Sequence, residues 1–90
     1  MTQFGISPDV AYMAGPEALP RANGQLVFDA PWQGRALAMA MALSRQPGVG
    51  WERFRSLLIA AIAAQPAAPY WESWVTALEN LTAEIAAPLA

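Results

Sequence analysis

The chain has 90 residues and a net charge of −2, and 56% of its residues are hydrophobic while only 13% are charged. Its five basic residues are all arginines and form no basic stripe that would contact phosphates, so we expect no nucleic-acid partner. Cysteine and histidine are absent, which excludes disulfides, thiol redox chemistry, cysteine or histidine zinc sites and the commonest catalytic base.

The low charge content predicts a protein partner. An average globular domain has about 25% charged residues, and a chain this short buries a smaller share of its surface than a longer one. Apolar side chains must therefore remain on the surface, which is typical of a protein that associates with another chain. The longest apolar runs, residues 36–43 and 57–64, are far shorter than the roughly 20 residues that span a bilayer. With no signal-peptide pattern, we expect a cytoplasmic protein without membrane contact.

Residues 1–30 are predicted to form an extended, irregular N-terminal arm. Glycine and proline recur along it, and its hydrophobic residues follow no sustained period of 2 or 3.6. These hydrophobic residues are too numerous for a solvated tail, so we expect the arm to lie on its own helices or on a partner. Residues 26–28 could form a short extended piece, but without a second strand signal we expect no sheet.

Proline and glycine positions divide the rest of the chain into three predicted helices, over about residues 31–45, 50–65 and 69–86. Asp29 is the expected N-terminal cap of the first helix, and Pro31 suits its first turn. The short connections favour near-antiparallel neighbours around one core. We therefore expect an all-α fold, in which residues 31–90 form a three-helix bundle.

The first predicted helix is apolar on two sides. Trp32, Met39 and Leu43 share one face, whereas Leu37 and Met41 occupy a different one. A helix with two apolar faces is usually packed between two layers, so both faces are expected to be covered.

Arg55 breaks the pattern of the second predicted helix. Trp51, Phe54, Leu58 and Ile62 fall on one face of this helix, and Arg55 lies inside the same apolar arc. A guanidinium keeps its charge in a protein, and burying it without a partner is costly. Arg55 must therefore extend to water, pair with an acid of its own chain, or bind an anion supplied from outside.

Five aromatic residues lie on the second and third predicted helices: Trp51, Phe54, Tyr70, Trp71 and Trp74. Such residues pack in cores, but tryptophan and tyrosine beside an arginine are also enriched at interface hot spots. The sequence leaves both interpretations open. The serines have no histidine to activate them and the seven carboxylates are scattered, so we expect no enzymatic activity from this chain alone.

Several segments, in order, resemble a known family. They are Leu19-Pro20-Arg21, Asn23-Gly24-Gln25-Leu26-Val27-Phe28, Ala30-Pro31-Trp32-Gln33-Gly34-Arg35-Ala36, Trp51-Glu52-Arg53-Phe54-Arg55 and Pro69-Tyr70-Trp71-Glu72-Ser73-Trp74. Together they are similar to the N-terminal helical region of the nitrile hydratase β subunit. They look closest to the small stand-alone form of that region, the nitrile hydratase accessory (activator) proteins.

The resemblance implies a partner and a site. In this family the α subunit holds cobalt or iron in a cysteine-rich loop with two oxidised cysteines, and the complete enzyme hydrates nitriles to amides. The β subunit supplies an arginine that hydrogen-bonds the oxidised cysteines, and the matching residue here is Arg55. The positions that match the substrate pocket are Trp51, Phe54, Tyr70 and Trp74. No metal or other cofactor is expected on this chain itself.

Three functions are compatible with these features. The first is an accessory protein that binds the α subunit in a hetero-oligomer, assists metal insertion and cysteine oxidation, and then yields to the β subunit. The second is a small β-type subunit of a three-subunit nitrile hydratase or a thiocyanate hydrolase, which would contribute Arg55 and the pocket residues during turnover. The third is an all-α interaction module with no link to nitriles.

Overall fold

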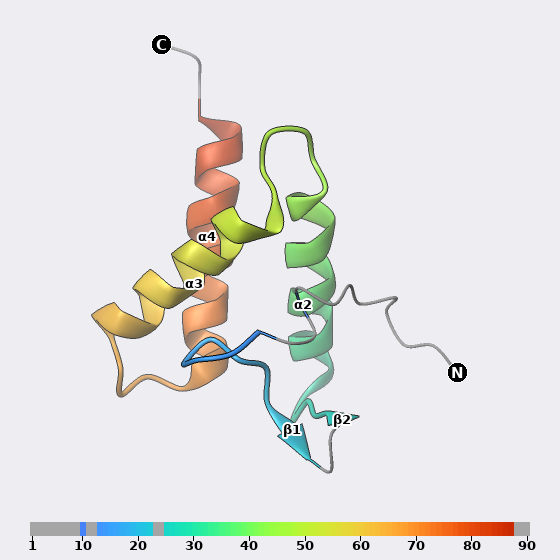
Figure 1. Ribbon diagram of the computed structural model, residues 1–90, viewed down its shortest axis with the longest axis vertical. Helices are drawn as coiled ribbons and strands as arrows, with labels where there is room; N and C mark the ends of the chain where they lie inside the picture. The colour runs from blue at the N-terminus through green and yellow to red at the C-terminus, as the bar shows by residue number, and fades with distance from the viewer. Residues whose placement is uncertain (1–9, 11–12, 23–24, 88–90) are drawn as a thin grey trace.

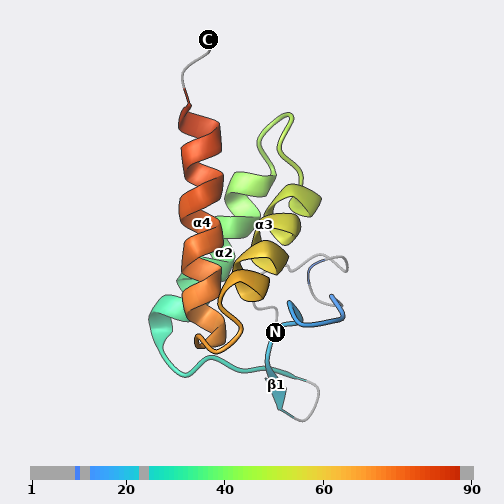
Figure 2. The same ribbon diagram turned by 90° about the vertical axis from the view of Figure 1, so that its left-hand side faces the viewer.

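The computed structural model describes residues 10, 13–22 and 25–87. Its elements are β1 (Arg21–Ala22), β2 (Gln25–Leu26), α2 (Pro31–Ser44), α3 (Trp51–Ala64) and α4 (Tyr70–Ala86) (Figure 1). Helices α2 and α4 lie side by side and run in the same direction, whereas α3 runs back at an oblique angle and crosses in front of α4 in Figure 1 (Figures 1 and 2). The predicted all-α three-helix bundle is confirmed, with helix bounds within one or two residues of the predicted ones.

The start of α2 differs from the prediction. Pro31 occupies the first turn as expected, but the N-cap is Ala30, which has no side-chain oxygen, and the predicted cap at Asp29 is wrong. The side chain of Gln33 reaches back instead, and its Oε1 accepts hydrogen bonds from the N–H groups of Asp29 at 2.7 Å and Ala30 at 3.4 Å. This is the reverse half of a capping box, which satisfies N–H groups ahead of the helix.

Two glycines shape the connection from α2 to α3. Gly48 and Gly50 have φ angles of +83° and +77°, in a region that side-chain-bearing residues rarely adopt. The N–H of Gly50 donates to the carbonyl of Ser44 at 3.0 Å and closes the turn. The chain therefore reverses within a few residues, and α3 begins at Trp51.

A small antiparallel ladder corrects the expectation that there would be no sheet. Strand β1 pairs with β2, with Arg21 opposite Leu26 and Ala22 opposite Gln25. The N–H of Val27 donates to the carbonyl of Pro20 at 3.1 Å and extends the pairing. The sequence between the strands is Asn-Gly, which is a strong hairpin signal that outweighs the shortness of the flanking strands.

The core lies where α3 and α4 meet α2. Its largest fully buried apolar side chains are Trp74, Phe54, Leu37, Leu58 and Leu81. Residues of the arm cover one side of it: Val10 and Leu19 are buried, and Met13, Leu26 and Phe28 pack against the core. In its described part the arm therefore lies on the chain's own helices, whereas the arm residues 1–9 lie outside the described residues. No described helix is long and apolar enough to cross a membrane.

Candidate functional site

The aromatic residues of α3 and α4 form one stack. Phe54 lies between Trp51 and Trp74, with ring centroids 5.0 and 4.9 Å away, and Trp71 continues the stack 4.9 Å from Trp74. Phe54 and Trp74 are fully buried, and Trp51 is 8% exposed. Three of the four residues that match pocket positions are therefore core residues in the free chain, while Tyr70 lies at the edge of the stack, 6.0 Å from Trp74.

Two polar groups inside the stack have no partner among the described residues. The indole Nε1 atoms of Trp51 and Trp74 are both buried without a hydrogen-bond acceptor. A buried donor left unpaired costs about 1–3 kcal/mol, so the surrounding packing must offset this cost. The stack is consequently held by ring contacts rather than by polar bonds.

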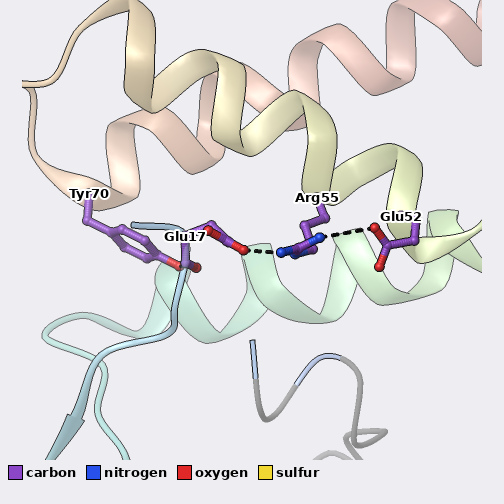
Figure 3. Close-up of polar contacts among 4 residues, drawn as sticks. All are labelled: Glu17, Glu52, Arg55 and Tyr70. Carbon is purple, nitrogen blue, oxygen red and sulfur yellow. Dashed lines mark hydrogen bonds and ion pairs between the residues drawn. The ribbon is translucent and has the colours of Figure 1, made fainter. Parts of the chain in front are cut away.

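Arg55 pairs with two acids of its own chain. Its Nε donates to Oε2 of Glu17 at 2.8 Å, and its Nη1 donates to Oε1 of Glu52 at 3.2 Å (Figure 3). The Arg55 side chain is 34% exposed, that of Glu52 is 75% exposed, and that of Glu17 is 1% exposed. Hydrogen bonds to Glu52 and Glu17 raise the pKa of Arg55 further above its ordinary value. Arg55 thus takes the second of its three predicted alternatives in the free chain.

Tyr70 joins the same group of residues through the arm. Its hydroxyl donates to the backbone carbonyl of Glu17 at 2.8 Å, and Glu17 lies between Tyr70 and Arg55 (Figure 3). Burial, followed by the charge of Glu17, raises the pKa of Tyr70, so its hydroxyl stays protonated and remains a donor at neutral pH. We call Glu17, Glu52, Arg55 and Tyr70 the Arg55 cluster.

The local fold around Gly15 presents Glu17 to Arg55. Gly15 has a φ of +88°, and its carbonyl accepts a hydrogen bond from the N–H of Ala18 at 3.1 Å, which makes a turn around Glu17. A Cβ at Gly15 would lie 3.0 Å from Oε1 of Glu17. A side chain at this position would therefore strain the backbone and crowd the carboxylate.

The Arg55 cluster pairs charges of opposite sign in a partly buried position. Two carboxylates and one guanidinium give it a formal charge of −1. The third guanidinium nitrogen, Nη2, makes no hydrogen bond to a described residue. Among the described residues, no three histidine, cysteine, aspartate or glutamate side chains are placed to hold a metal ion.

Glu17 is the functional residue that sequence analysis missed. It lies 38 residues before Arg55, in a segment without periodicity, and the sequence indicated only that an acid of the same chain could pair with Arg55. Arg53 of the same helix is half-exposed and forms a second ion pair, in which its Nε donates to Oε1 of Glu84 at 2.8 Å and its Nη2 contacts Oε2.

Apolar surface remains exposed, as the composition predicts. Leu37 and Met41 of α2 are buried, but Trp32 is 40% and Met39 is 52% exposed on the other face. The expectation that both faces of this helix are covered is met only in part: Leu43 packs against the core, whereas the described part of the chain leaves Trp32 and Met39 exposed. Together with Val75 of α4, the two exposed residues line a groove of about 380 Å³ between α2 and α4. Such a surface is typical of a chain with a protein partner.

Comparison with known families shows which family the chain resembles. The family model described as "Nitrile hydratase beta subunit, N-terminal" matches residues 8–86, a range that includes the arm residue Glu17, all three helices and Arg55. No curated protein and no solved structure is significantly similar to the chain. Because the match extends over most of its length, the chain belongs to the family of the nitrile hydratase β subunit N-terminal domain.

Proposed function

We propose that this chain is an accessory protein of nitrile hydratase that binds the cysteine-rich, metal-carrying α subunit. In this role it holds the α subunit while the metal is inserted and the cysteines are oxidised, and it then exchanges with the β subunit. Family membership and the exposed apolar groove on α2 and α4 support such a partner.

The observation that carries the proposal is the position of Arg55 on the surface of α3. Its side chain is one-third exposed, and its guanidinium retains a nitrogen without a hydrogen bond to a described residue. A planar guanidinium suits the oxygens of oxidised cysteines because it can donate two parallel charge-assisted hydrogen bonds. By resemblance to the family, Arg55 is the residue that contacts these oxygens.

Tyr70 is the second donor that we assign to this contact. Its hydroxyl donates to the backbone carbonyl of Glu17 and the Arg55 guanidinium donates to the side chain of the same buried residue, so the two donors meet at Glu17. The proposed contact is supported by the aromatic stack of Trp51, Phe54 and Trp74. This stack packs α3 against α4 and so fixes the position of Arg55. Their place at a substrate pocket or an interface stays a prediction that concerns the assembled complex.

The metal belongs to the partner in this proposal. The chain has neither cysteine nor histidine, so it offers no thiolate or imidazole to cobalt or iron. Its contribution is to hold the α subunit and to orient the oxidised ligands through hydrogen bonds, as groups around a metal site generally do.

Co-expression with the cysteine-rich α-type subunit tests this function. The complex is purified through a tag on this chain, and α content, cobalt content and nitrile hydration are measured before and after β subunit is added. Co-purified α that becomes active only when β replaces this chain is the expected result. Failure of α to co-purify would contradict the proposal.

The role of Arg55 is tested in the same complex. Arg55→Ala should weaken the complex in gel filtration and lower cobalt loading. Arg53→Ala is the matched control, because it removes the same charge from the same helix but breaks only the exposed pair with Glu84. If the two variants form equally stable complexes in gel filtration and carry equal amounts of cobalt, the role proposed for Arg55 is contradicted.

A small β-type subunit of a three-subunit nitrile hydratase or thiocyanate hydrolase is the second candidate, favoured by the match to the β subunit itself. This function predicts hydration, or thiocyanate hydrolysis, while the chain remains bound to α. Activity measured in fractions that contain this chain therefore separates the two candidates.

A further inference from the structure

Glu17 is a buried carboxylate that depends on Arg55. Its side chain is 1% exposed, and the hydrogen bond from Nε of Arg55 is its one ionic contact with a described residue. A buried carboxylate is tolerated only while it is paired, because the charge has lost its hydration. Any change that takes Arg55 away from Glu17 therefore makes the buried position of Glu17 unfavourable.

The charge of the Arg55 cluster opposes a further anion. Glu17 and Glu52 already place two negative charges around one guanidinium. A third anion at Nη2 would meet a net negative cluster, and like charges at such short range repel strongly in a partly buried site. An anion from a partner must therefore replace a carboxylate rather than join both.

The two carboxylates differ in how they can leave. The side chain of Glu52 is 75% exposed, so it can rotate into water without moving the backbone. Glu17 can reach water only if its backbone moves, which also breaks the hydrogen bond from the Tyr70 hydroxyl to its carbonyl. Departure of Glu52 releases only Nη1 of Arg55. Removal of Glu17 releases Nε of Arg55 and the hydroxyl of Tyr70 together, and these are the two donors that the proposed function assigns to the partner.

We infer that Glu17 fills the anion site of Arg55 in the free chain, and that an anion of the partner binds by displacing Glu17 with the arm segment 13–22. The inference rests on the proposed function, since it takes Arg55 to be the contact for the α subunit. Docking of the arm and binding of the partner anion then exclude each other, so each weakens the other by the same factor.

Two measurements on the full chain with purified α-type subunit carrying oxidised cysteines test this displacement. Hydrogen exchange of the wild type should show that backbone amides of residues 13–22 lose protection when α binds, while α3 and α4 keep theirs. Glu17→Gln should bind α roughly tenfold more tightly, because the charge-assisted hydrogen bond between Glu17 and Arg55 no longer competes with the partner anion. The free energy of one such hydrogen bond sets this scale. Glu52→Gln is the matched control and should change the affinity less.

The outcomes separate this inference from the proposed function. Binding that depends on Arg55, combined with retained protection of residues 13–22 and no gain in affinity for Glu17→Gln, would overturn the displacement and leave the accessory role standing. Absence of α binding by the wild-type chain would overturn both. Hydrogen exchange uses the unmodified chain, so the test remains decisive even if Glu17→Gln disturbs the arm.

Discussion

Replacement of Phe54 by alanine distinguishes a core role from an interface role for the aromatic residues. Phe54 is fully buried between Trp51 and Trp74, with ring centroids 5.0 and 4.9 Å away. Truncating such a side chain typically costs about 3–5 kcal/mol, because burial is lost and a cavity remains. A chain of this size has a free energy of unfolding of roughly 5–13 kcal/mol, so the variant should lose a large fraction of its stability.

Urea unfolding followed by tryptophan fluorescence and circular dichroism measures this loss. Trp51 and Trp74 flank the substituted position, so their emission should also shift to longer wavelength in the folded variant. Met39→Ala is the control: Met39 is 52% exposed, and its substitution should change stability by less than about 0.5 kcal/mol. A loss of under about 1 kcal/mol for Phe54→Ala, accompanied by weaker binding of α, would refute the core role.

Three further predictions follow from individual contacts. Tyr70→Phe removes the hydrogen bond to the Glu17 carbonyl but keeps the ring, so the arm should lose about 0.5–1.5 kcal/mol of local stability in hydrogen exchange, and unchanged exchange would contradict this. Gln33→Ala removes the acceptor ahead of α2 and should lower the free energy of unfolding by about 1 kcal/mol in urea, whereas no change would show that water replaces it. The hydrogen bond and charge of Arg53 lower the pKa of Glu84, so this pair stabilises the fold above the ordinary glutamate pKa and loses its effect as pH falls through the lowered value. Glu84→Gln should therefore flatten the acid side of the profile of Tm against pH, and parallel profiles would refute the assignment.

The helices could be predicted from the sequence because their limits depend on nearby residues. Pro31 favours the first turn of α2, and the positive φ angles of Gly48 and Gly50 interrupt the helical conformation between α2 and α3. The predicted N-terminal cap of α2 was wrong. Both Asp29 and Gln33 have side chains that can accept hydrogen bonds at the start of the helix, and the sequence does not show which one does so. The hairpin was missed because its strands are too short to show an alternating pattern.

The candidate site could be predicted only in part. The apolar arc of α3 indicated that the charge of Arg55 must reach water, an acid of its own chain or an external anion, and this follows from helix geometry alone. The identity of that partner depends on where the arm lies on the finished bundle, and Glu17 is 38 residues away. The acceptor for Tyr70 is a backbone carbonyl, which carries no sequence signature. Contacts of this kind are decided by tertiary structure.

The two sides of the Arg55 cluster are held with unequal strength, and this difference favours displacement of the arm over deformation of the helices. Arg55 projects from a helix whose neighbouring residues Trp51 and Phe54 are locked into the stack with Trp74. Moving it would break packing that carries much of the stability. Glu17 is held at its own position by two hydrogen bonds, one from Nε of Arg55 to its carboxylate and one from the Tyr70 hydroxyl to its backbone carbonyl. A partner whose anion binds both Arg55 and Tyr70 is therefore expected to displace Glu17 rather than to move the helix that carries Arg55.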